Sequence, residues 1–137
     1  MMKLLASTAA LLISLTLPAH AADAREERTA SGMGITTLKE GAGANPKMTD
    51  TVKVNYRGTL ENGQEFDSSY KRGQPATFPL SRVIPCWTEG VQKIKVGGKA
   101  RLTCPAAIAY GERGAGGVIP PNAVLQFEVE LLAIAGK

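Results

Sequence analysis

Histidine is the residue type whose scarcity says most about this 137-residue chain. The single histidine, His20, lies in an apolar N-terminal segment and outside the part of the chain that is expected to fold. The folded part therefore has no Ser-His or Cys-His pair for nucleophilic catalysis and no histidine for a metal site. Two cysteines are also too few for a structural zinc site within one chain. No cofactor and no metal is expected.

Long hydrophobic runs are scarce as well. The one extended run is Leu4–Leu17, which follows Lys3 and precedes Ala-His-Ala at residues 19–21, an A-x-A cleavage pattern. This arrangement is typical of a secretory signal peptide, and the run is shorter than the ~20 residues of a membrane-spanning helix. We expect residues 1–21 to be removed and Ala22 to become the first residue. The alternative is a membrane anchor.

Clusters of basic residues are missing too. The net charge of +4 falls to +3 when Lys3 leaves with the signal peptide, and there is no Lys/Arg run of five or more. No later segment is apolar and long enough to span a membrane. No nucleic-acid or membrane partner is therefore expected, and the chain is interpreted as an exported domain that is periplasmic or secreted.

Three local patterns suggest a binding or catalytic site, but each lacks a feature that such a site requires. The glycines of residues 111–117 match neither the spacing of a phosphate-binding loop nor that of a dinucleotide fingerprint. Ser68 and Ser69 follow Asp67 but lack a base that would activate a serine. Cys86 and Cys104 are not a C-x-x-C pair, which disfavours a thiol oxidoreductase.

The pattern of apolar residues predicts strands and one short helix. Apolar and polar residues alternate in residues 51–60 and 123–134, as in strands with one buried face. Residues 85–94 carry one apolar stripe at helical spacing, with Pro85 at an early helical position. The other expected strands are residues 35–38, 65–67, 76–80 and 99–104. The fold class is α+β, an antiparallel sheet of about five strands around one short α-helix.

The expected domain organisation is simple. Residues 1–21 form the signal peptide, residues 22–32 a polar and flexible leader, and residues 33–137 one folded domain. Residues 68–75 and 111–122 are expected to be loops. A long irregular loop such as the second is often functional.

Aromatic residues are few and come from several separate elements. With one Trp, three Tyr and three Phe, they could simply fill the core. The short motifs around them favour a different interpretation. These motifs are Val54-Asn-Tyr-Arg-Gly58, Gly63-x-x-Phe66-Asp-Ser-Ser69, Val83-Ile-Pro-x-Trp87-x-x-Gly90, Leu102-Thr103, Ala109-Tyr-Gly111, Ile119-Pro-Pro-Asn-Ala123 and Leu125-x-Phe-x-Val-Glu-Leu131.

In this order and spacing the motifs resemble the FK506-binding protein (FKBP) family of peptidyl-prolyl cis-trans isomerases, in its small exported bacterial form. The resemblance covers residues 33–135. It implies a bent antiparallel sheet wrapped around a short helix, with a pocket between the two. It also implies an enzyme that accelerates X-Pro isomerisation while exported proteins fold, with proline-containing polypeptides as clients and FK506- or rapamycin-type macrolides as inhibitors.

The resemblance also implies roles for individual residues. Asp67, Trp87 and Tyr110 are the expected catalytic group, with Trp87 as the floor of the pocket. The Ile84 backbone N–H is expected to donate to the bound chain, and Val118 and Ile119 to overhang the pocket. The expected substrate-binding residues are Tyr56, Phe66, Val83, Ile84, Val118, Ile119 and Phe127.

The chain departs from the family at several positions. Cys86 stands where glycine is usual and Cys104 where an aliphatic residue is common, so we predict a Cys86–Cys104 disulfide over two free buried thiols. Ala76 replaces a phenylalanine of many eukaryotic members, which is expected to reduce contact with macrolides. The leader is shorter than the dimerising arm of larger exported relatives, so a monomer is expected. The alternative function is a chaperone or interaction module that holds proline-containing segments in the same pocket.

Overall fold

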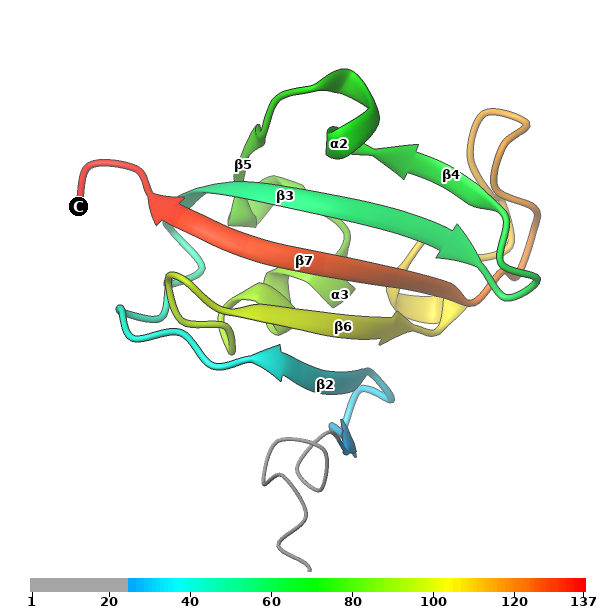
Figure 1. The fold of residues 1–137 in the computed structure, drawn as a ribbon. Coiled ribbons are helices and arrows are strands. Elements are labelled where there is room, and N and C mark those ends of the chain that lie inside the picture. Colours follow the sequence, from blue (N-terminus) through cyan, green and yellow to red (C-terminus); the bar gives the residue numbers. More distant parts are fainter. Residues whose placement is uncertain (1–24) are drawn as a thin grey trace, which may run out of the picture.

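The computed structural model describes residues 25–137 (Figure 1). The expected signal peptide, residues 1–21, lies outside the described residues. None of the helices in the described part is long and apolar enough to cross a membrane.

Within residues 25–137, seven strands form one antiparallel sheet in the order β1-β2-β6-β7-β3-β4, with β5 paired to β3. In Figure 1, β2, β6, β7 and β3 run side by side in this order, and helix α3 lies behind them. The predicted α+β class is confirmed, although the sheet has more strands than the five expected. The strands are β1 (Glu26–Arg28), β2 (Gly34–Lys39), β3 (Thr51–Leu60), β4 (Glu65–Ser68), β5 (Ala76–Pro79), β6 (Lys99–Cys104) and β7 (Leu125–Ile134).

Two ten-residue strands, β3 and β7, form the centre of the sheet and pair along almost their whole length. The predicted alternation is present in both, because every second side chain is buried beneath the sheet along β3 and along β7 as far as Leu131. On β3 the buried positions include Val52, Val54 and Tyr56, and on β7 they include Phe127. These two strands therefore supply both core residues and, at one end, side chains of the cavity described below.

Helix α3 (Pro85–Val91) begins with Pro85 at its first position, as predicted, but ends earlier than expected. Ile94 lies beyond the end of the helix, in a segment of turns. It is nevertheless buried, like the other residues of the apolar stripe. Gly90 allows the helix to lie close to β6, since a Cβ atom there would come within 2.8 Å of the Leu102 side chain. The helix is therefore packed directly onto the sheet.

Two segments differ from expectation. Residues 68–75 were expected to form a loop but contain a one-turn helix, α2 (Ser69–Arg72). The Ser68 hydroxyl caps it by accepting a hydrogen bond from the Lys71 N–H, and Gly73 ends it with a left-handed φ of 75°. A polar four-residue helix has no apolar periodicity, so its sequence carries no helical signal. The described part of the chain also contains two 3-10 helices, η1 (Leu80–Arg82) and η2 (Ala106–Ile108).

The expected flexible leader is also structured in part, and this expectation was wrong for residues 26–28. Strand β1 pairs antiparallel with β2 at the edge of the sheet. Beyond it, the Ser31 hydroxyl donates a 2.5 Å hydrogen bond to Glu89 of α3. Backbone pairing needs no apolar pattern, so a charged Glu-Glu-Arg segment can form an edge strand without signalling it.

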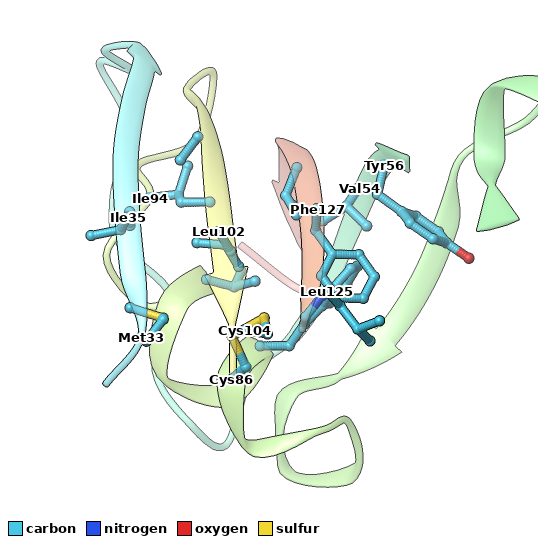
Figure 2. Close-up of a cluster of buried hydrophobic side chains, with 14 of the residues drawn as sticks. Met33, Ile35, Val54, Tyr56, Cys86, Ile94, Leu102, Cys104, Leu125 and Phe127 are labelled. Carbon is cyan, nitrogen blue, oxygen red and sulfur yellow. A yellow bond between two sulfur atoms is a disulfide. The ribbon is translucent and has the colours of Figure 1, made fainter. Parts of the chain in front are cut away.

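The predicted disulfide between Cys86 and Cys104 is present. Figure 2 shows it between the start of α3 and the end of β6, within the buried cluster. Both cysteines are fully buried. The bond therefore fixes the first turn of the helix to the sheet.

Loss of this disulfide is expected to lower the free energy of unfolding. The bond joins residues 18 positions apart, and in the chain-entropy model closing a loop of that size stabilises a protein by about 3 kcal/mol. Urea unfolding of the Cys86→Ala/Cys104→Ala variant, beside the oxidised and reduced wild type, measures the difference. Equal unfolding midpoints for oxidised and reduced wild type would contradict this prediction. So would two free thiols in the unreduced, unfolded protein.

Candidate active site

A cavity of about 430 Å³ lies between α3 and the inner face of the sheet. Six of the seven aromatic residues line it, and Tyr70 is the exception. The complete lining is Tyr56, Phe66, Asp67, Phe78, Arg82, Val83, Ile84, Trp87, Tyr110 and Phe127. The scattered aromatic residues of the sequence thus meet at one place.

Trp87 is the centre of this cluster. Its ring meets those of Tyr56, Phe78 and Phe127 edge to face, at centroid distances of 5.2, 5.4 and 5.3 Å. Edge-to-face contacts are the favoured geometry for aromatic pairs. Trp87 is only 4% exposed, and its indole N–H has no hydrogen-bond partner among residues 25–137. The ring is therefore held firmly while one polar atom stays unpaired.

The start of α3 is fastened at several points. The Trp87 N–H donates to the Ile84 carbonyl at 2.9 Å, and the Thr88 hydroxyl donates to the Leu80 carbonyl at 2.7 Å. Cys86 is bonded to β6. Ile84 is the N-cap residue, so its own N–H takes no part in the hydrogen bonds of the helix. The position of Trp87 and the direction of the Ile84 N–H are thus set by the same contacts.

Gly58 makes room for two of the rings. It lies in β3 opposite Phe127 of β7 and Asp67 of β4. A Cβ atom at this position would come within 2.6 Å of the Phe66 ring and 2.9 Å of the Phe127 ring. The two rings meet edge to face at 5.6 Å over the glycine. Any larger residue at position 58 would push them into the cavity.

Asp67 belongs to a hydrogen-bonded group of three side chains. The Tyr56 hydroxyl donates to one carboxylate oxygen at 2.5 Å. Arg72, from the unexpected helix α2, donates to the other oxygen at 2.7 Å and to the Tyr56 hydroxyl at 2.9 Å. The guanidinium also lies 5.6 Å from the centre of the Tyr56 ring, within cation–π range. The carboxylate is therefore fixed in orientation and paired with a positive charge.

These contacts change the acidity of the group. Partial burial alone would raise the pKa of Asp67, but the hydrogen bonds from Tyr56 and Arg72 outweigh it and lower the pKa. Burial, followed by the hydrogen bond to Asp67, raises the pKa of the Tyr56 hydroxyl. At neutral pH Asp67 is thus ionised and Tyr56 is protonated, so the hydroxyl is the donor.

Tyr110 lies at the mouth of the cavity, just beyond η2. It is 40% exposed. The turn that carries it is closed by the Gly111 N–H, which donates to the Ala106 carbonyl at 2.9 Å. Its hydroxyl is therefore on a defined support and accessible to a molecule that enters the cavity.

Val118 and Ile119 were expected at the cavity but are not part of its lining. Ala115 and Ile119 pair through two backbone hydrogen bonds of 3.0 Å, which close the glycine-rich loop on itself. This turn directs Ile119 into the core, where it is 7% exposed, and leaves Val118 51% exposed. Neither side chain reaches the cavity in this structure. The other eight expected site residues line it.

Three residues near the cavity were missed at the level of sequence. Phe78 lines the cavity wall from β5. Its position could have been predicted from the sequence, because it lies on the same face of the strand as Ala76, two residues earlier. Arg72 reaches Asp67 only because α2 forms, and α2 has no sequence signal. Arg82 is one of several exposed arginines, and nothing local distinguishes it.

No group of three or more metal-ligating side chains occurs within residues 25–137. The site offers apolar rings, one oriented carboxylate, one accessible hydroxyl and an arginine.

Comparison with known proteins assigns the family. The sequence model described as FKBP-type peptidyl-prolyl cis-trans isomerase matches residues 43–132, which include every residue of the cavity lining. The chain belongs to this family.

Individual FKBP-type relatives agree. FkpA of Aeromonas hydrophila is 58% identical over 117 residues, which cover 83% of this chain and 43% of the relative. FkpA of Escherichia coli is 51% identical over 106 residues, covering 77% of this chain and 39% of the relative. FK506-binding protein 1 of Dictyostelium discoideum is 55% identical over 103 residues, covering 74% of this chain and 96% of the relative. The match thus spans about two fifths of the FkpA sequences.

Solved FKBP-type structures share the fold. The crystal structure of FkpA from Escherichia coli superimposes with a TM-score of 0.77 at 49% identity, covering 80% of this chain and 51% of that chain. The crystal structure of AtFKBP13 superimposes with a TM-score of 0.75 at 36% identity, covering 81% of this chain and 99% of that chain.

In this FKBP-type site, Arg72→Gln is expected to raise the pKa of Asp67 toward its ordinary value. The variant loses one of the three donors that favour ionisation, since the Tyr56 hydroxyl and the Ser68 N–H remain, and the burial that opposes ionisation is unchanged. Because the folded-state pKa of Asp67 is lowered, the stabilisation it gives is present at neutral pH. It is lost as the pH falls through that pKa. An NMR titration of the Asp67 carboxyl carbon measures the shift.

Arg57→Gln is the matched control for this titration. Arg57 pairs with Glu65 and not with Asp67, so its replacement is expected to raise the pKa of Glu65 and leave that of Asp67 unchanged. An Asp67 pKa that stays the same or falls in Arg72→Gln would show that Arg72 does not control the carboxylate.

Proposed function

We propose that the protein is a peptidyl-prolyl cis-trans isomerase that acts on X-Pro bonds of other polypeptides. The observation that carries the proposal is the aromatic cavity over Trp87, open to solvent and edged by the Asp67 carboxylate and the Tyr110 hydroxyl. Membership of the FKBP-type family supports the proposed activity.

The chemistry of the reaction suits such a site. Rotation about an X-Pro bond costs the resonance of the amide, with a barrier of roughly 18–20 kcal/mol. No covalent bond is made or broken, so neither a nucleophile nor a metal is required. The twisted amide is less polar than the planar one, and a cavity that removes water from it favours the twisted state over the ground state.

Each part of the lining has a place in this mechanism. The proline ring packs on the face of Trp87, with the surrounding rings as side walls. The Ile84 N–H and the Tyr110 hydroxyl donate hydrogen bonds to carbonyl groups of the bound chain and hold it on both sides of the rotating bond. This positioning supplies orientation before rotation begins.

Asp67 acts by orientation and local field. Its carboxylate is already occupied by Tyr56 and Arg72, which makes it a poor nucleophile and a stable dipole beside the cavity. Arg72 is a positioning residue, because it acts on the substrate through Asp67. The Tyr56 hydroxyl acts in the same way, while the Tyr56 ring is part of the side wall.

The setting of the reaction is also part of the proposal. A buried disulfide is stable in oxidising compartments, which supports export and a role in the folding of other exported proteins. The clients are proline-containing polypeptides. FK506- and rapamycin-type macrolides are proposed as competitive ligands of the cavity, and the protein is proposed to act as a monomer.

Isomerisation of a Leu-Pro peptide, measured by NMR exchange spectroscopy, tests the function. Slow X-Pro steps otherwise take tens to hundreds of seconds, so an enzyme brings cis and trans signals into measurable exchange and FK506 suppresses it. Peptide binding without exchange would favour the chaperone or interaction module. Neither exchange nor FK506 binding would reject the isomerase.

Tyr110→Phe is expected to lower kcat/KM about two- to tenfold, the usual value of one hydrogen bond to an uncharged partner. Tyr70→Phe is the matched control, because Tyr70 is exposed on α2 and does not line the cavity. Equal losses in the two variants would remove the proposed role of the Tyr110 hydroxyl.

A further inference from the structure

The cavity wall contains two charged residues, Asp67 and Arg82, and their situations differ. The Asp67 charge is balanced by Arg72 through a 2.7 Å ion pair. Arg82 is exposed. Among residues 25–137, no carboxylate oxygen lies within 4.0 Å of its guanidinium nitrogens, the distance limit for an ion pair. The wall of the cavity therefore carries an uncompensated positive charge.

Most other arginines of the described chain have a partner. Arg57, Arg72 and Arg101 each pair with a carboxylate of a neighbouring strand, and Arg28 pairs with a carboxylate of its own strand. An arginine at the edge of a site is free to bind an acidic group of an incoming molecule. Arg82 is thus distinguished by its combination of place and lack of partner.

The backbone that carries Arg82 is well anchored. Leu80, two residues earlier in η1, is fully buried, and its N–H donates to the Asp50 carbonyl at 3.0 Å. Its carbonyl accepts the Thr88 hydroxyl of α3 at 2.7 Å. Ile84, whose N–H faces the bound chain in the proposed mechanism, follows two residues after Arg82. The side chain of Arg82 therefore starts from a fixed point beside the path of the substrate.

We infer that Arg82 is a specificity-determining residue that favours substrates with Asp or Glu next to the isomerising proline; this inference rests on the proposed function. The planar guanidinium offers paired N–H donors that match a carboxylate. Because Arg72 compensates Asp67, that carboxylate does not neutralise Arg82. The same charge repels Lys or Arg at the flanking position, so one residue supplies both attraction and rejection.

The expected size of the effect is modest, because the pair forms at an exposed site. Exposed ion pairs change equilibria by about 1.5- to fivefold. Attraction of Glu and repulsion of Lys act together, so the two factors multiply and the ratio of kcat/KM for the two substrates is expected to be about two- to 25-fold. Added salt is expected to reduce this ratio, since exposed charges are screened.

The experiment uses acetylated, amidated pentapeptides that differ only in the residue before the proline, which is Glu, Leu or Lys. A second set varies the residue after the proline. NMR exchange spectroscopy gives kcat/KM for each peptide with the wild-type protein, at low salt and at high salt. A Glu-to-Lys ratio above one in at least one set, falling with salt, is the expected result.

Two variants at position 82 and one control complete the test. Arg82→Gln is expected to bring the Glu-to-Lys ratio close to one, and Arg82→Glu to invert it. Lys53→Gln makes the same change of net charge on the outer face of β3, where Lys53 is exposed and outside the cavity lining. The control is expected to keep the wild-type ratio, and thermal unfolding checks that each variant is folded.

Different outcomes test the role of Arg82 and the isomerase activity itself. A wild-type ratio of one in both sets, or the same ratio in Arg82→Glu as in the wild type, with normal exchange of the Leu peptide, overturns the role of Arg82 and leaves the isomerase intact. Loss of preference in Lys53→Gln as well as in Arg82→Gln also overturns it, since net charge alone would then be responsible. No exchange with any peptide rejects the isomerase and this inference together.

Discussion

The packing of Trp87 between the start of α3 and the sheet is the interaction on which the rest of the site depends. Its ring touches Tyr56 of β3, Phe78 of β5 and Phe127 of β7 edge to face. Three strands and a helix are thus joined through one side chain. A small shift of α3 would change the floor and three walls together, which explains why its first turn is held by a disulfide and by the Thr88–Leu80 hydrogen bond.

A second constraint acts on the polar side of the cavity. An ionised carboxylate beside apolar rings is costly unless it is paired and hydrogen-bonded. Arg72 and Tyr56 provide hydrogen bonds to both oxygens of Asp67, so the charge at the edge of the cavity is paired. Arg72 comes from α2, which exists because Ser68 caps its start and Gly73 ends it. A polar turn outside the core therefore determines the electrostatics of the site.

Sequence patterns predicted most of the framework, and the exceptions have physical reasons. The alternation in β3 and β7 could be predicted because burial of one face imposes it. Of the ten site residues that the motifs led us to expect, eight line the cavity. Strand β1 and helix α2 were missed because backbone pairing and capping stabilise them rather than apolar burial. Ile119 lies in the core and outside the cavity lining because the Ala115 turn sets its direction, and the glycine-rich sequence does not predict that turn.

An aromatic cluster of this kind would ordinarily close on itself, so the persistence of a cavity needs a cause. Edge-to-face geometry holds rings at an angle and keeps them from stacking flat. Gly58 leaves the Phe66 and Phe127 rings a place against the strand and away from the cavity, and the fastened helix keeps Trp87 from moving toward the sheet. The apolar surface therefore stays open to solvent at a cost in stability, which the proline ring of a substrate would offset in the proposed function. The same rigidity that maintains the cavity makes the site suited to a reaction that needs only desolvation and orientation.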